Sequence, residues 1–339
     1  MPLPAPRALA LAALVAAVAS PPALGQSRVG TTAGAFLGIG AGARYVGAGE
    51  TAIATADDAG ALYWNPAGIA AVPGGEVSFQ HTEWTAGTRL EYAAGVITAG
   101  SAGTLGAHLY LFESGEMDVT TLEFEDGTGE TFDVQDVAVG LSYARALTTA
   151  FNIGGTVKYV NTRVFRSSAA TVAADVGVQY QTPFRGLALG FGIFNFGSEM
   201  RLEGDNTAIR TDLDPDTGGD NDGVLANLAT QSWDLPLLFR IGLAYDALDT
   251  AALDVRVAAD AYFPNDNDQY VNVGAEVTLL DLLHLRGGLA HLLLADTHGQ
   301  GTLRLGAGID LAGTLRADYA VSDRADLGMI HTIGASFRF

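Results

Sequence analysis

The chain has 339 residues, no cysteine and 43 glycines, and its 18 basic against 38 acidic side chains give a formal net charge of −20. The missing cysteines exclude disulfides and thiolate metal sites, and the acidic balance argues against nucleic-acid binding, which needs a basic surface. The glycine content is too high for a protein with an ordinary packed core. Small residues that alternate with apolar ones suit the wall of a β-barrel instead.

The first 25 residues have the organisation of a secretory signal peptide. Arg7 supplies the positive charge, residues 8–19 form an apolar run, and two prolines and several small residues follow. The apolar run is shorter than the ~20 residues that a membrane-spanning helix needs. Cleavage is predicted before Gln26, and no later segment predicts a transmembrane helix.

Residues 26–74 are predicted to form a compact hatch, or plug, that packs inside something larger. The stretch is rich in small residues and ends in the string Tyr63, Trp64, Asn65, Pro66. Asn65–Pro66 is a turn dipeptide, and the two aromatic residues need burial together with a polar partner for O–H and N–H. We predict these four as hatch or gating residues, with Trp64 and Asn65 anchoring the hatch to the lumen wall by hydrogen bonds.

The same stretch allows an alternative interpretation, an ordinary N-terminal cap over a core. Residues 48–56 can form a short helix, while the glycines on either side interrupt any long one.

Residues 75–339 are predicted to form an all-β, transmembrane antiparallel barrel of about 14 strands. Val139, Leu141 and Tyr143 share one face of their segment, and Gly140 and Ser142 share the other. A soluble sandwich also alternates, but its polar face lies in water, where glycine and alanine have no special use. The predicted strands cover residues 75–84, 90–99, 103–112, 132–145, 150–163, 170–181, 186–195, 234–247, 251–263, 269–279, 283–293, 301–309, 313–322 and 328–339.

The connections between these segments alternate in length. One set is short, and the other contains longer or acidic loops, which include residues 113–131, 164–169 and 196–233. Short turns on one rim and long loops on the other are typical of the periplasmic and external ends of outer-membrane barrels. The terminal strand ends in Phe339, a common feature of such barrels, so the sequence predicts the outer membrane of a Gram-negative-type bacterium, with membrane lipid as a partner.

Charged residues recur on the predicted lumen face with mixed signs, which favours paired ladders over an ion-selective pore. The lumen-facing charges are Lys158, Arg240, Arg256, Glu276 and Arg304.

Candidate catalytic and metal-binding motifs are weak. The six histidines have no metal-binding spacing, and no nucleophile elbow or phosphate loop occurs, so we expect neither an enzyme nor a cofactor. Closely spaced carboxylates in one loop can ligate calcium, but they lack the helix-loop-helix spacing, and a solvated acidic loop is the favoured interpretation. These weak metal candidates are Asp212, Asp214, Asp216, Asp220 and Asp222.

Several strings together resemble the PorV/PorQ-type outer-membrane barrels, within the wider FadL-like group. The resemblance is carried by Gly42–Gly49, Ala56–Ala59 and Tyr63–Gly68, and by later strings such as Gly140–Arg145 and Ala174–Gly177. It covers nearly all of the predicted mature chain.

The resemblance implies a fourteen-stranded barrel with an N-terminal hatch and no catalytic residues. PorV-like relatives assist type IX secretion, which would make secreted proteins and other secretion-machine subunits the partners. FadL-like relatives pass hydrophobic small molecules through a hatch-gated lumen. The acidic loops at residues 123–130 and 212–222 favour the secretion role, with the FadL-like channel as the alternative.

Overall fold

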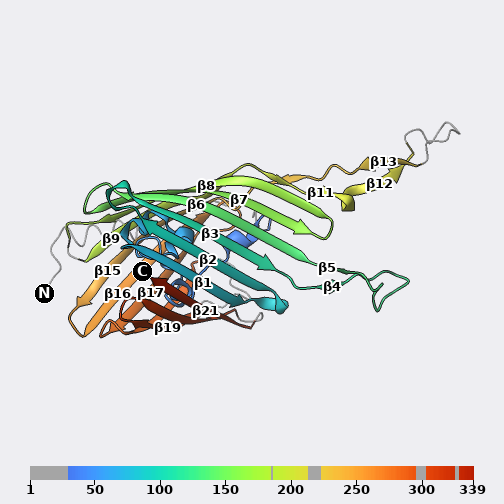
Figure 1. Ribbon diagram of the computed structural model, residues 1–339. Coiled ribbons are helices and arrows are strands. Elements are labelled where there is room, and N and C mark those ends of the chain that lie inside the picture. The colour runs from blue at the N-terminus through green and yellow to red at the C-terminus, as the bar shows by residue number, and fades with distance from the viewer. Residues whose placement is uncertain (1–29, 185, 213–222, 295–302, 325–327) are drawn as a thin grey trace.

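The computed structural model describes residues 30–184, 186–212, 223–294, 303–324 and 328–339. Within those residues, the main sheet consists of fourteen wall strands and the two-residue strand β11 (Glu203–Gly204), which pairs with β8. Every wall strand is antiparallel to its neighbours, and β1 pairs with β21, so the wall is a closed barrel (Figure 1). The predicted fold class is therefore confirmed.

The wall strands follow one another around the ring in chain order. They are β1 (Gly75–Glu83), β2 (Arg89–Thr98), β3 (Thr104–Glu113), β6 (Val134–Ala146), β7 (Phe151–Val164), β8 (Ser167–Gln181), β9 (Leu187–Gly197), β15 (Leu238–Asp249), β16 (Leu253–Pro264), β17 (Tyr270–Leu279), β18 (Leu283–Leu292), β19 (Leu303–Leu311), β20 (Leu315–Asp323) and β21 (Met329–Arg338).

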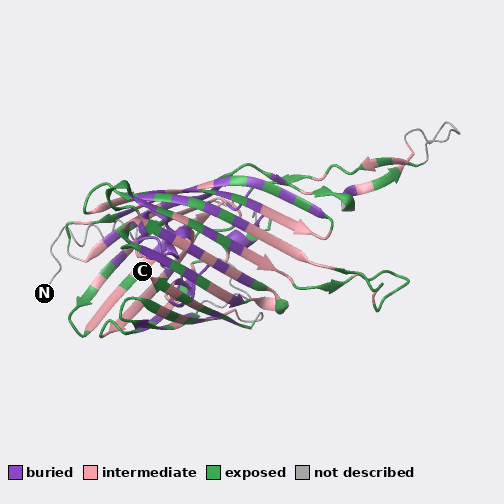
Figure 2. Ribbon diagram, in the orientation of Figure 1, coloured by how far each residue is buried: buried purple, intermediate pink, exposed green. Residues whose placement is uncertain are grey.

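Alternate residues of each wall strand face opposite sides of the barrel, as the period of two predicts. Leu141 is 68% exposed and Val157 61% exposed, whereas Ser142 and Lys158, their neighbours in sequence, are buried (Figure 2). An apolar outer face of this extent is stable only against lipid. The chain is therefore a β-barrel of the outer membrane. No helix in the described part of the chain is long and apolar enough to cross a membrane.

The described hatch residues, 30–74, lie inside the barrel, and the wall begins at Gly75. The short helices of the hatch are η1 (Ala35–Gly38), α2 (Ala43–Gly47), α3 (Ala61–Trp64) and η2 (Pro66–Ala71). The helix that residues 48–56 could form is absent, because this stretch is built of turns. Gly49 and Glu50 adopt left-handed backbone angles, with φ of 76° and 62°, which no α-helix accommodates. The predicted signal peptide lies outside the described residues.

The two rims differ as predicted, with one exception. Both ends of the wall, Gly75 and Phe339, lie on the rim of short turns. On the other rim, two hairpins project beyond the barrel (Figure 1). The prediction of a longer loop at residues 164–169 is wrong. β7 ends at Val164 and β8 begins at Ser167, so only a tight turn at Phe165 and Arg166 joins them.

The remaining elements belong to the rims. They are η3 (Thr85–Gly87), η4 (Gly100–Ala102), β4 (Met117–Asp118), β5 (Thr131–Phe132), β10 (Met200–Arg201), η5 (Asp205–Thr207), β12 (Ala208–Thr211), β13 (Val224–Asn227) and β14 (Ser232–Trp233).

Candidate functional site: the hatch and the cavity on its outer side

Asn65 joins the hatch to the barrel wall. Its side chain is fully buried, and its amide nitrogen donates to the carbonyl oxygen of Val178 on β8 at 3.0 Å and to that of Ile53 in the hatch at 2.6 Å. Its amide oxygen accepts from the backbone N–H of Ala67 at 3.1 Å, which caps η2, and Pro66 begins that helix. Asn65 therefore makes the wall contact that we predicted for it.

Trp64 and Tyr63 bond within the hatch. The indole N–H of Trp64 donates to the carbonyl of Ala41 at 2.7 Å, and the hydroxyl of Tyr63 donates to that of Leu37 at 2.9 Å. The expectation that a hydrogen bond of Trp64 anchors the hatch to the wall is wrong, because the indole reaches back to the turn before α2. The two aromatic residues thus hold the hatch together. The ring of Tyr63 also packs against Tyr92 and Tyr110 of the wall, and Arg240 of the wall lies over the ring of Trp64.

Polar side chains of the wall bind the backbone of the hatch. Asp260 on β16 accepts from the N–H groups of Ala52 and Ile53 at 2.8 and 3.0 Å. The amide of Gln179 on β8 donates to the carbonyl of Ala56 at 2.8 Å. These bonds satisfy buried backbone groups that no helix or strand of the hatch pairs, and each unsatisfied group would cost ~1–3 kcal/mol.

Glycines of the wall allow the hatch to approach the strands backbone to backbone. A Cβ at Gly154 would lie 2.5 Å from the carbonyl carbon of Pro66, and one at Gly177 would lie 2.0 Å from Oδ1 of Asn65. Such separations are too short for any side chain, so the hatch fits only where the wall has no Cβ. The wall glycines whose Cβ would meet a hatch residue within 3.0 Å are Gly106, Gly154, Gly177, Gly190, Gly242, Gly274, Gly288 and Gly306.

Glu50 is the buried acidic group at the centre of the hatch. Its carboxylate lies 3.4 Å from Nε of Arg304 and 3.9 Å from Nη2 of Arg324, and its carbonyl accepts from the hydroxyl of Tyr262. Burial alone would raise the pKa of Glu50, but Arg304, His291 and Arg324 together hold the pKa below its ordinary value. The carboxylate is therefore ionised and ties the hatch to β19 and to the end of β20.

The predicted lumen charges are placed inside the barrel, and most have ionic partners. Lys158 lies 2.8 Å from Asp175, Arg256 lies 2.7 Å from Asp246, and Arg304 pairs with Glu50. Glu276 pairs with Arg286, which also lies 2.5 Å from Asp318. The contacts between wall strands form ladders of opposite charge, and the pair Arg304–Glu50 joins the wall to the hatch.

Arg240 is the exception, because it makes no ion pair with any described residue. Its side chain is 4% exposed, and neither Nε nor Nη1 has a hydrogen-bond partner in the described structure. Aromatic rings surround the guanidinium instead. We call these rings the Arg240 box; their centroids lie 4.7 to 5.7 Å from Cζ of Arg240, and they belong to Tyr63, Trp64, Phe194 and Tyr262.

A cavity of about 220 Å³, the outer cavity, lies between the hatch and the external rim. Arg240 and three rings of its box, those of Tyr63, Trp64 and Tyr262, form part of its lining. Glu50, Tyr270, His291 and loop residues such as Asp266 also line it. Two strand irregularities border it. Asn195 in β9 and His291 in β18 sit at register shifts and have left-handed φ of 62° and 59°.

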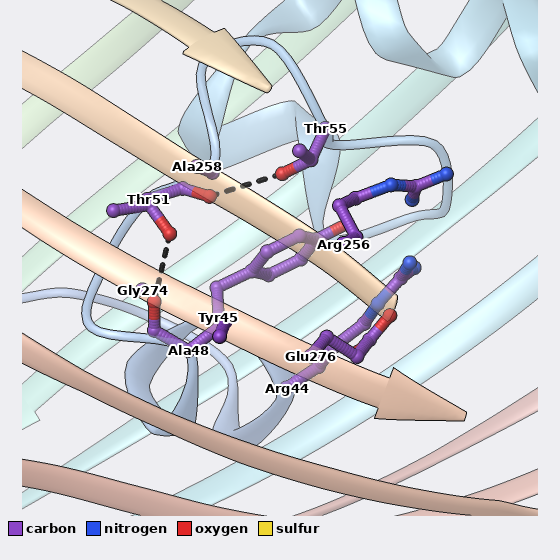
Figure 3. A pocket seen from close by; sticks show the side chains of 10 residues that line it. Arg44, Tyr45, Ala48, Thr51, Thr55, Arg256, Ala258, Gly274 and Glu276 are labelled. Carbon is purple, nitrogen blue, oxygen red and sulfur yellow. Dashed lines mark hydrogen bonds between the residues drawn. The ribbon is translucent and has the colours of Figure 1, made fainter. Parts of the chain in front are cut away.

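A second pocket, the inner pocket, lies on the opposite side of the hatch and has a volume of about 30 Å³. Figure 3 shows Arg44 and Glu276 extending along it and Thr51 and Thr55 at its other end. Its wall residues Arg256 and Ala258 lie nearer the short-turn rim than Tyr262 of the outer cavity, which is on the same strand. Glu50 lines the outer cavity, and the next residue, Thr51, lines the inner pocket. Because adjacent residues face the two spaces here, we call residues 48–53 the thin part of the hatch.

The weak metal candidates stay untested. Asp214, Asp216, Asp220 and Asp222 lie outside the described residues, and the described part of the chain contains no cluster of three or more metal-ligating side chains.

Sequence reasoning missed the site around Arg240. The period of two correctly assigned Arg240 to the lumen face, but Tyr63, Phe194 and Tyr262 come from the hatch and from different strands. No spacing in the sequence indicates that these rings meet around one guanidinium, and no local signal marks the irregularities at Asn195 and His291.

A closed fourteen-strand wall, an apolar outer face and a hatch in the lumen define this chain as a hatch-containing β-barrel of the outer membrane. It belongs to the uncharacterised protein family UPF0164, whose profile matches residues 10–183. No curated protein sequence matches the chain. The PorV/PorQ type within this class remains a prediction.

Several solved structures share the fold. The Pseudomonas putida toluene transporter TodX aligns with a TM-score of 0.59 at 13% identity over 88% of this chain and 98% of that chain. The Ralstonia pickettii toluene transporter TbuX has a TM-score of 0.55 at 13% identity over the same shares, and a Pseudomonas aeruginosa FadL homologue has 0.53 at 13% over 88% and 98%. At 13% sequence identity, these alignments show that the proteins share a fold.

Proposed function

We propose that this protein is a channel of the outer membrane that takes up small, largely apolar molecules by way of the outer cavity and the hatch. The observation that carries the proposal is the outer cavity itself, about 220 Å³ of space lined by the rings of Tyr63, Trp64, Tyr262 and Tyr270. Ligand sites are typically concave and rich in aromatic residues, with a few polar groups for orientation.

The fold supports the same proposal. Proteins with this architecture include a toluene transporter and a monoaromatic hydrocarbon channel, by the descriptions of those structures. The acidic outer loops favoured the secretion role, but charge on a rim is also explained by solvation alone. The outer cavity and the shared architecture give more support to the channel role.

Uptake into sealed vesicles tests the channel. The purified full-length protein is reconstituted into liposomes, and entry of a neutral monoaromatic compound is compared with entry into protein-free liposomes. Faster entry with protein, at equal lipid and equal leak of a large sugar, is the expected result. Equal rates in the two preparations contradict the proposal.

A role in delivering exported proteins to the surface is the second candidate, and the projecting hairpins favour it. The two-stranded units β4–β5 and β12–β13 extend beyond the barrel (Figure 1) and expose Phe124, Leu225 and Trp233 nearby. Deletion of the gene separates the two roles. Impaired uptake with a normal surface proteome supports the channel, and loss of surface-attached proteins with normal uptake supports secretion.

The proposed role requires no catalysis. Activity-based probes for serine hydrolases are expected to leave the purified protein unlabelled, at the level of a heat-denatured control. Specific labelling of the folded protein would overturn the non-enzymatic role.

A further inference from the structure

The buried guanidinium of Arg240 has no ion-pair partner among the residues that the structure describes. Removing a cation from water is costly unless it gains a counter-charge or hydrogen bonds. Contacts with the faces of the four aromatic rings recover part of that cost. They do not satisfy N–H donors, and Nε and Nη1 have no partner in the described structure.

The two acidic residues that line the outer cavity, Glu50 and Asp266, already have partners. Glu50 pairs with Arg304 and Arg324, and Asp266 accepts from the hydroxyl of Thr32 at 2.8 Å. Asp260 does not line the cavity. Its Oδ2 accepts from two backbone N–H groups of the hatch, its Oδ1 has no hydrogen-bond partner in the described structure, and it makes no ion pair with Arg240 there. An external anion that enters the cavity would therefore meet an available cation.

The size and the lining of the cavity indicate what kind of anion would fit it. A cavity of ~150 Å³ holds one benzene molecule, so about 220 Å³ accommodates a single ring with a small substituent. Tyr63, Trp64, Tyr262 and Tyr270 line the cavity and give it aromatic surface that an apolar ring can contact. A planar carboxylate matches the fork of N–H donors on a guanidinium.

We infer that the outer cavity is a binding site for small aromatic monocarboxylates, with Arg240 binding the carboxylate and the rings of Tyr63, Trp64 and Tyr262 binding the apolar body. The inference rests on the proposed channel function and names its preferred substrate class. It differs from a site for neutral hydrocarbons because the charge of the ligand, as well as its shape, decides affinity.

Three probes of one shape isolate the effect of charge. Benzoate, benzamide and benzamidinium are planar and nearly equal in size, and carry charges of about −1, 0 and +1 at neutral pH. Binding to the detergent-solubilised full-length protein is measured by calorimetry, with fluorescence of Trp64 and the other tryptophans as a second readout. Benzoate is expected to bind at least tenfold more tightly than benzamide, and benzamidinium to show no binding. Equal affinity for benzoate and benzamide overturns the inference.

A pair of variants assigns the effect to Arg240. Arg240→Met removes the charge and keeps an unbranched side chain, and it is expected to lower the affinity for benzoate at least tenfold, to the level of benzamide. Arg166→Met removes the same charge from the external rim, where Arg166 is 56% exposed and pairs with Glu130, and it should leave both affinities unchanged. Retained benzoate affinity in Arg240→Met overturns the inference. If that variant does not fold, the comparison of the three probes on the unmodified protein decides.

Flux measurements separate this inference from the channel proposal. Entry of neutral benzamide into liposomes without any preference for benzoate in binding overturns the carboxylate site and leaves the channel. Selective binding of benzoate without flux of any probe supports the site and contradicts the channel.

Discussion

Individual residues hold the hatch in place through contacts that have no substitute nearby. Asn65 shows this most directly, because one amide bonds the wall, the hatch loop and the cap of η2 at once. The contacts are buried, so water does not replace a lost bond.

Asn65→Ala is expected to loosen the hatch while the barrel remains intact. The substitution leaves the carbonyls of Ile53 and Val178 without this donor, at a cost of ~1–3 kcal/mol for each buried group that stays unpaired. Conductance in planar bilayers should rise, with the melting of the wall unchanged. Unchanged conductance would reduce Asn65 to a packing role.

Gly177→Ala tests the fit between the wall and the hatch. The new methyl group would lie 2.0 Å from Oδ1 of Asn65, so the hatch has to shift or be expelled. The matched control is Gly95→Ala, whose methyl group would meet only Val77 Cγ1 at 3.8 Å. We expect increased conductance and faster proteolysis of residues 30–74 for Gly177→Ala alone; similar behaviour of both variants would contradict this explanation of the glycines.

Glu50 predicts a pH dependence of hatch stability. Its folded-state pKa is lower than the unfolded value of ~4.3, so its ion pairs stabilise the hatch above that value, and the stabilisation is lost as the pH falls through the folded-state pKa. The difference in hydrogen-exchange protection of the hatch between the natural protein and Glu50→Gln should therefore shrink on acidification below pH ~4. A constant difference from neutral to acid pH would contradict the assignment.

At the scale of elements, the thin part of the hatch and the projecting hairpins are the segments most open to change. Residues 48–53 separate the outer cavity from the inner pocket and are held to the wall by Asp260. Asp260→Ala should raise the hydrogen-exchange rates of the Ala52 and Ile53 amides more than those of α3. Uniform acceleration across the hatch would mean that the segment does not move independently.

The hairpin β12–β13 should be removable without damage to the barrel. The N–H of Leu228 donates to the carbonyl of Thr207 at 2.8 Å, so the two ends of residues 208–227 already lie side by side. A variant that joins residues 207 and 228 through two glycines is expected to keep its thermal stability and its uptake of small molecules. If uptake persists and surface-attached proteins are lost, the hairpin serves the secretion role.

Sequence reasoning performed best for these elements where a simple period applies. The wall strands were predicted within a few residues, because Val139, Leu141 and similar positions must alternate with lumen positions over the whole strand. It failed where tertiary contacts decide local structure. Residues 48–56 form turns instead of a helix because Gly49 lies in close contact with Gly288 of the wall. The partners of Trp64 and Arg240 come from distant segments of the chain.

At the scale of the whole molecule, a closed wall surrounds a hatch that is hydrogen-bonded to it. The pairing of the wall strands and the bonds to the hatch should both contribute to the stability of the protein. We expect the protein in the outer-membrane fraction to migrate faster in mild detergent than after boiling, because a closed barrel resists unfolding. An Asn65→Ala, Asp260→Ala double variant should keep this shift, because neither side chain contributes to the pairing of wall strands. Loss of the shift would show that the wall depends on the hatch.

The backbone fit at the wall glycines has a consequence for biogenesis. Gly154 and Gly177 leave no room for a Cβ between wall and hatch, so we expect the hatch to be fitted while the wall can still open. The hatch also precedes β1, and β1 meets β21 at the seam, where Glu76 bonds both Ala59 of the hatch and Arg338 of the last strand. We therefore expect closure of the seam to follow hatch placement, so that the pairing of the final strand would depend on whether the lumen has been filled.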